Sequence, residues 1–147
     1  MDKKNNYQML MTSSSAVDGY KSSDENRLSC SFSQLLSGYA ISFEEVAEDK
    51  AHIHTLIKIY QNDDDVKVTV KRSGAVESVM NFEKNRITDF KYKTSVGTLP
   101  LFLKTGEINI SRDKERFLLA LSYSLYQEVG ESEKMLSENE FTICIFL

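Results

Sequence analysis

The chain has 147 residues, and its 18 basic and 22 acidic residues give a formal net charge of −4. This length suits a single domain over residues 1–147 that folds without a disulfide or a metal, and the negative charge argues against nucleic acid as the main partner. No stretch is apolar for long enough to cross a bilayer, and the first six residues lack the apolar core of a signal peptide, so we expect a cytoplasmic protein with no membrane partner.

The first half of the chain contains short segments in which every second residue is apolar. An alternation of period two places one face of a strand in the core and the other in solvent. The predicted strands cover residues 7–12, 27–33, 39–43 and 53–59. The serine-rich residues 13–26, with Asp18-Gly19 as a turn pair, predict a polar loop that is a candidate mobile segment. The acidic residues 44–50 predict a second connection.

From Val66 to the C-terminus the alternation is nearly continuous. The predicted strands cover residues 66–72, 76–82, 87–94, 99–110 (bent near Thr105-Gly106), 117–125 and 141–147. Residues 129–138 predict a long surface loop. Eight to ten short strands joined by polar turns predict an all-β fold, a single antiparallel barrel, because closure removes the exposed sheet edges.

Short motifs over residues 39–147 occur in an order that is typical of a known family. They are ISFEE at 41–45, TLIKI at 55–59, VKVTVKRSG at 66–74, MNFE at 80–83, YKT at 92–94, YSL at 123–125 and NE at 139–140. This ordered set resembles the YwiB-like family of small bacterial proteins of unknown function. The resemblance implies a calycin-like (lipocalin-like) β-barrel. It implies no activity, and a shared barrel does not determine a function.

Six polar side chains share the parity of the apolar residues on their strands and should therefore point into the barrel. They are Glu45, Arg72, Tyr92, Thr94, Thr105 and Tyr123. A buried charge needs a partner, so Arg72 is expected to be buried and paired with Glu45. Two interpretations of the six remain open. They form either a core network that satisfies itself or a site in the lumen for a small anionic or apolar ligand.

In the second interpretation, the guanidinium of Arg72 holds a carboxylate or phosphate group, because its planar fork binds such groups in a bidentate manner. The rings of Tyr92 and Tyr123 then supply flat apolar walls. Small-ligand sites usually combine such walls with a few polar anchors.

No pattern in the sequence indicates a catalytic residue, a metal site or a cofactor. Cys30 and Cys144 have no neighbouring ligand residues and are predicted to be free thiols. His52 and His54 share a strand face with Lys58 but have no evident third ligand, so exposed histidines are favoured over a metal pair. The sequence contains no nucleophile elbow and no phosphate-binding loop.

Three hypotheses for the function follow from these observations. The first is a non-enzymatic barrel that binds a small ligand in its lumen. The alternative is a protein–protein interaction module whose barrel core is solid. An enzyme that uses Glu45 and Arg72 is the least favoured. The volume of the lumen discriminates between the first two.

Overall fold

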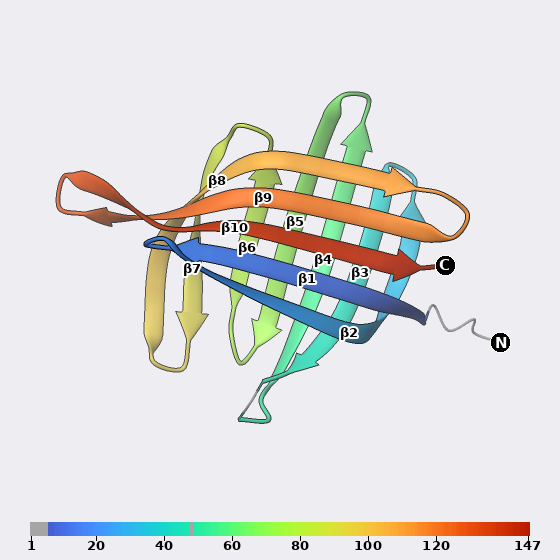
Figure 1. Cartoon of the computed structure of the whole chain (residues 1–147), viewed down its shortest axis with the longest axis horizontal. Coiled ribbons are helices and arrows are strands. Elements are labelled where there is room, and N and C mark those ends of the chain that lie inside the picture. Colours follow the sequence, from blue (N-terminus) through green and yellow to red (C-terminus); the bar gives the residue numbers. More distant parts are fainter. Residues whose placement is uncertain (1–5, 48) are drawn as a thin grey trace.

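The structure is a computed structural model that describes residues 6–47 and 49–147. Ten strands follow one another along the chain (Figure 1): β1 (Tyr7–Val17), β2 (Tyr20–Leu35), β3 (Gly38–Val46), β4 (His52–Asn62), β5 (Asp65–Gly74), β6 (Ser78–Glu83), β7 (Ile87–Thr94), β8 (Gly97–Arg112), β9 (Arg116–Val129) and β10 (Ser132–Phe146). The described part of the chain has no helix that is long and apolar enough to span a bilayer. The first five residues, on which the expectation about a signal peptide depends, lie outside the described residues.

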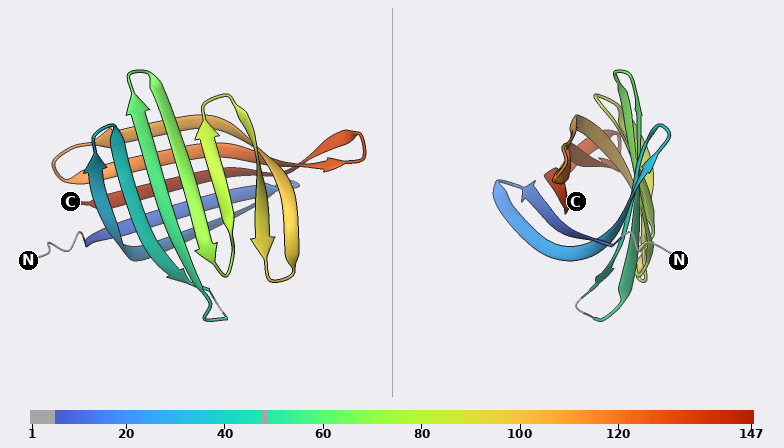
Figure 2. Two further views of the ribbon diagram at one scale, coloured as in Figure 1. Left: turned by 180° about the vertical axis from the view of Figure 1, so that it is seen from behind. Right: turned by 90° about the vertical axis from the view of Figure 1, so that its right-hand side faces the viewer.

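All ten strands belong to one antiparallel sheet with the order β6-β5-β4-β3-β2-β1-β10-β9-β8-β7. The two edges meet, because Glu77, which directly precedes β6, and Lys93 of β7 exchange two backbone hydrogen bonds of 2.9 Å. The sheet therefore forms a nearly closed barrel, and the prediction of an all-β antiparallel barrel is confirmed. Seen from the side of the molecule, β2 curves from one half of the barrel to the other (Figure 2). It pairs with β1 from Tyr20 and with β3 over its last residues.

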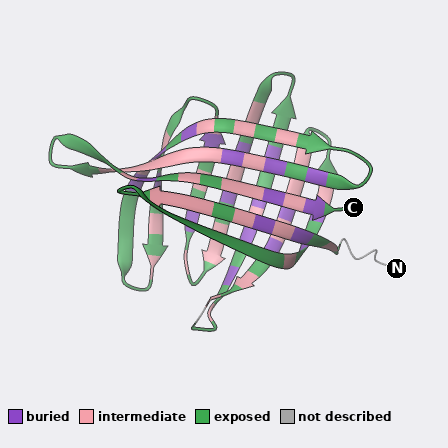
Figure 3. Cartoon of the chain, viewed as in Figure 1, coloured by how far each residue is buried: buried purple, intermediate pink, exposed green. Residues whose placement is uncertain are grey.

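Buried and exposed residues alternate along most strands (Figure 3), as the period of two predicts. One end of the interior is filled by aromatic rings. Phe117 is fully buried, with its ring centre 4.9 Å from that of Phe32 and 4.8 Å from that of Tyr39. The guanidinium of Arg112 lies 5.4 Å from the centre of the Phe32 ring and donates a 2.7 Å hydrogen bond to Gln34. Arg112 thus covers a packed end of the barrel.

Two segments that the sequence predicts as loops are strands, so those two predictions are wrong. Residues 13–26 continue β1 and β2, and only Asp18 and Gly19 form the turn between them. Residues 129–138 form the tip of the β9–β10 hairpin, where β10 already begins at Ser132. Both tips are largely exposed. A strand that extends beyond the apolar core has few apolar residues on its inner face, so it shows no regular alternation of apolar and polar residues.

Candidate functional site

A cavity of about 290 Å³ lies inside the barrel, beyond the aromatic end. Most of its wall is apolar and is formed by Met11, Phe43, Val70, Met80, Phe82, Leu121 and Phe141. Its polar lining residues are Ser13, Asp24, Asn26, Glu45, Thr55, Arg72 and Tyr123. This volume is at the lower end of the ~300–1,000 Å³ range of small-molecule sites.

Three of the six residues predicted for the site, Glu45, Arg72 and Tyr123, meet in this cavity. Arg72 points inward because it continues the parity of the buried Val68 and Val70 on β5. Its Nη2 atom lies 3.9 Å from Oε1 of Glu45. Glu45 is therefore the partner of Arg72, as predicted. Arg72 is less buried than predicted, because 29% of its side chain is exposed. A separation of 3.9 Å is too long for a hydrogen bond.

Tyr123 and Phe82 make an edge-to-face contact, with 5.1 Å between the ring centres. Burial raises the pKa of the Tyr123 hydroxyl, and the positive charge of Arg72 offsets part of that rise. Tyr123 thus stays a neutral hydroxyl that can donate or accept a hydrogen bond inside the cavity.

Two buried hydroxyl groups flank Arg72 without partners. Thr55 on β4 and Ser78 on β6 lie directly opposite Arg72 in the sheet register. Their side chains are 3% and 6% exposed, and neither Oγ atom has a hydrogen-bond partner among the described residues. A buried hydroxyl without a partner costs about 1–3 kcal/mol. A core network that satisfied itself would have used these groups, so the network interpretation does not account for them.

The other three predicted residues, Tyr92, Thr94 and Thr105, do not line this cavity. Tyr92 is partly buried against the core. Thr94 lies at the β7–β8 turn, where its Oγ1 accepts a hydrogen bond from the backbone N–H of Val96. Thr105 is 1% exposed and lines a different pocket. Parity specifies the face of a strand on which a side chain lies, but not its level along the barrel.

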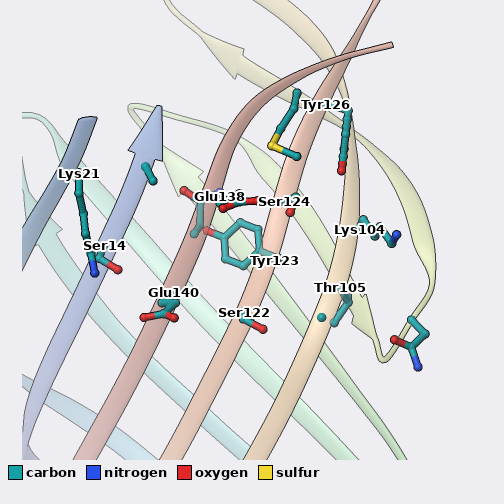
Figure 4. A pocket seen from close by; sticks show the side chains of 15 residues that line it. Ser14, Lys21, Lys104, Thr105, Ser122, Tyr123, Ser124, Tyr126, Glu138 and Glu140 are labelled. Atoms are coloured by element: carbon teal, nitrogen blue, oxygen red, sulfur yellow. The ribbon is translucent and has the colours of Figure 1, made fainter. Parts of the chain in front are cut away.

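The pocket beside Thr105 is a groove of about 450 Å³, shown in Figure 4. Side chains from several neighbouring strands line it, among them the exposed Lys21, Lys104, Glu138 and Glu140. Tyr123 lines both the groove and the inner cavity. Among the described residues, the groove has four exposed charged residues, whereas the inner cavity has one, Asp24, and mostly apolar walls, so the groove is the weaker candidate for a small-ligand site.

Thr55, Asp24 and Asn26 also line the cavity, although they are absent from the predicted set. Thr55 lies on the same strand face as Ile53, Ile57 and Ile59. Thr94 and Thr105 were predicted as site residues from the same kind of alternation, so the sequence could have identified Thr55 as well. Asp24 and Asn26 carried no such signal, because their segment reads as a polar loop.

The histidine pair lies on the outer surface. Nδ1 of His52 and Nδ1 of His54 each lie 3.9 Å from a carboxylate oxygen of Glu44, a neighbour that the sequence did not reveal. All three side chains are at least half exposed. The described residues contain no cluster suited to a metal ion. Cys30 and Cys144 are free, as predicted.

The chain is similar to the crystal structure of the YwiB protein from Bacillus subtilis, with a TM-score of 0.79 and 24% sequence identity. The similarity covers 97% of this chain and 91% of the YwiB chain, and at this identity it supports the fold alone. No curated protein matches the chain. The family model for a domain of unknown function, DUF1934, matches residues 10–143. The expected resemblance is thus confirmed, and the chain belongs to the DUF1934 family.

Proposed function

We propose that this protein binds a small ligand with a carboxylate group inside its barrel and is not an enzyme. The observation that carries the proposal is the cavity of about 290 Å³, in which a mostly apolar wall holds the guanidinium of Arg72, the only cationic group among the described residues that line it. Small-molecule sites usually have this composition, with few polar groups that orient the ligand. The volume favours a compact ligand over a long-chain fatty acid.

Arg72 is the anchor in this proposal. Its guanidinium has no hydrogen-bonded partner among the described residues, and its nearest carboxylate, on Glu45, is 3.9 Å away. A ligand carboxylate would bind the fork of Arg72 through two parallel hydrogen bonds. It would also offer an acceptor to the hydroxyl of Tyr123, which lines the same cavity. A phosphate dianion is disfavoured, because Asp24 and Glu45 also line the cavity and would repel its second charge.

The inner cavity supports ligand binding over the alternative of an interaction module with a solid core. We further propose a cytoplasmic location, which the free thiols of Cys30 and Cys144 support, since disulfides are rare in reducing compartments. The ten-stranded barrel supports the calycin-like (lipocalin-like) architecture as part of the same proposal. Barrels of that size can hold one small ligand.

The proposal is tested by thermal-shift measurements with separate panels of small carboxylates, phosphates, amines and neutral apolar compounds. A ligand present at 100 times its Kd stabilises the native state by about 2.7 kcal/mol. For a domain of this size that corresponds to a rise in Tm of about 5–10 °C. Native mass spectrometry of protein purified from its own cells would detect a ligand that is already bound.

The decisive variant is Arg72→Met, which keeps a long apolar side chain and removes the charge. Lys71→Met is the matched control, because Lys71 is exposed on the opposite face of the same strand. The shift caused by a carboxylate should disappear in Arg72→Met and persist in Lys71→Met. If no panel raises Tm, or if a carboxylate stabilises both variants equally, the proposed function is wrong.

A further inference from the structure

The charges that line the inner cavity do not suit a simple anion. Asp24, Glu45 and Arg72 are its charged residues, which gives two carboxylates and one guanidinium. A monoanion bound at Arg72 would add a further negative charge close to Glu45, whose side chain is only 25% exposed. Like charges repel strongly where apolar walls lower the effective dielectric constant. A ligand that carries a positive group beside its carboxylate avoids that repulsion.

We infer that the inner cavity binds a small zwitterion, in which an ammonium group and a carboxylate share a compact apolar body. This inference rests on the proposed function and specifies the class of ligand. The carboxylate binds Arg72, and the ammonium group lies against Glu45, with Asp24 as a second carboxylate lining the same cavity. The apolar body packs against Phe43, Met80, Phe82 and Leu121.

The geometry of the ion pair suits a ligand whose two charges lie close together. Nη2 of Arg72 and Oε1 of Glu45 lie 3.9 Å from each other. A ligand whose carboxylate and ammonium groups lie on the same or adjacent carbon atoms can reach two anchors this close together with both groups. α-Amino acids with apolar side chains have this arrangement, and their side chains match the apolar walls of the cavity.

The hydroxyl of Tyr123 completes the expected contacts. Tyr123 lines the cavity together with Arg72 and Glu45. Its hydroxyl can donate to a carboxylate oxygen of the ligand, and it can equally accept from an ammonium group.

Isothermal titration calorimetry with the full chain tests this inference. The probes are L-leucine and L-phenylalanine, each compared with its deaminated acid (4-methylpentanoate or 3-phenylpropionate) and its decarboxylated amine (3-methylbutylamine or phenethylamine). We expect at least one amino acid to bind about tenfold or more tightly than both of its analogues. In the double variant Asp24→Asn, Glu45→Gln, that preference over the deaminated acid should be lost or reversed. Glu44→Gln, on the outer face of β3, should keep it.

The outcomes separate this inference from the proposed function. If a deaminated acid binds the unmodified protein as tightly as its amino acid, the zwitterion is wrong, but a carboxylate site remains. If an amine binds most tightly, both are wrong. If no probe binds at millimolar concentration while the carboxylate panel still stabilises the protein through Arg72, only the zwitterion fails. The comparison of analogues uses the unmodified protein, so it holds even if the double variant does not fold.

Discussion

The unpartnered hydroxyl of Thr55 makes the substitution Thr55→Val a sensitive test of the candidate site. Valine has nearly the same shape as threonine, so the change removes the hydroxyl without opening a cavity. The side chain is 3% exposed, and its Oγ1 atom has no partner among the described residues. Such a group costs about 1–3 kcal/mol of desolvation that no hydrogen bond offsets. The ligand-free protein should therefore gain about 1–2 kcal/mol in free energy of unfolding.

Urea denaturation of the ligand-free protein measures this gain, and a rise in Tm of about 2–8 °C should accompany it. Thr69→Val is the control for the β-propensity of valine. Thr69 lies on the outer face of β5, and its hydroxyl donates a 3.0 Å hydrogen bond to Asn81, so its replacement should be neutral or slightly destabilising. If Thr55→Val destabilises the protein as much as Thr69→Val does, the hydroxyl has a partner, and the reasoning about the site is refuted.

Three further outcomes follow from the structure. Arg72→Met should lower the free energy of unfolding by about 1–2 kcal/mol, between the values for exposed and buried ion pairs. A double-mutant cycle with Glu45→Gln should give a coupling energy of less than about 1 kcal/mol. A loss of about 3–5 kcal/mol for Arg72→Met would instead indicate a buried ion pair without water. Phe117→Ala should lower the free energy of unfolding by about 3–5 kcal/mol in urea titrations, since the ring is fully buried, and a loss below about 1 kcal/mol would contradict its place at the packed end. Burial raises the pKa of the Cys30 thiol from 9.0 to about 11, so the folded state holds this proton more tightly than the unfolded state. The stability that this thiol contributes is present below pH 9 and is lost as the pH rises toward 11. Unfolding curves should therefore show that the difference in free energy of unfolding between the unmodified protein and Cys30→Ala becomes smaller over this pH range.

The fold could be predicted from the sequence because burial on one face imposes a period of two. Where a strand packs against the core, as β5 does with Val66, Val68 and Val70, the alternation is unbroken and the strand was identified. The hairpin tips at residues 13–26 and 129–138 have few apolar core-facing residues, so backbone pairing accounts for most of what holds them as strands. Pairing through backbone groups leaves little trace in the side chains, which is why both tips read as loops.

The candidate site was predicted only in part, for a related reason. Parity brought Glu45, Arg72 and Tyr123 to the inner face of the barrel, and the three share one cavity. The same parity could not exclude Tyr92 or Thr94, since the level of a residue along the barrel depends on strand stagger, which the pattern of single strands does not contain.

The position of the cavity follows from the sizes of the side chains that point inward at each level. At one end, β2, β3 and β9 contribute the rings of Phe32, Tyr39 and Phe117, which fill the interior. Further along, β4 and β5 contribute Thr55 and Arg72, whose polar groups cannot form a close-packed apolar layer. A barrel selected only for stability would carry apolar residues at both levels. The unpartnered hydroxyl of Thr55 and the half-buried charge of Arg72 lower stability at this level, and a ligand that pairs with Arg72 would recover part of that loss on binding.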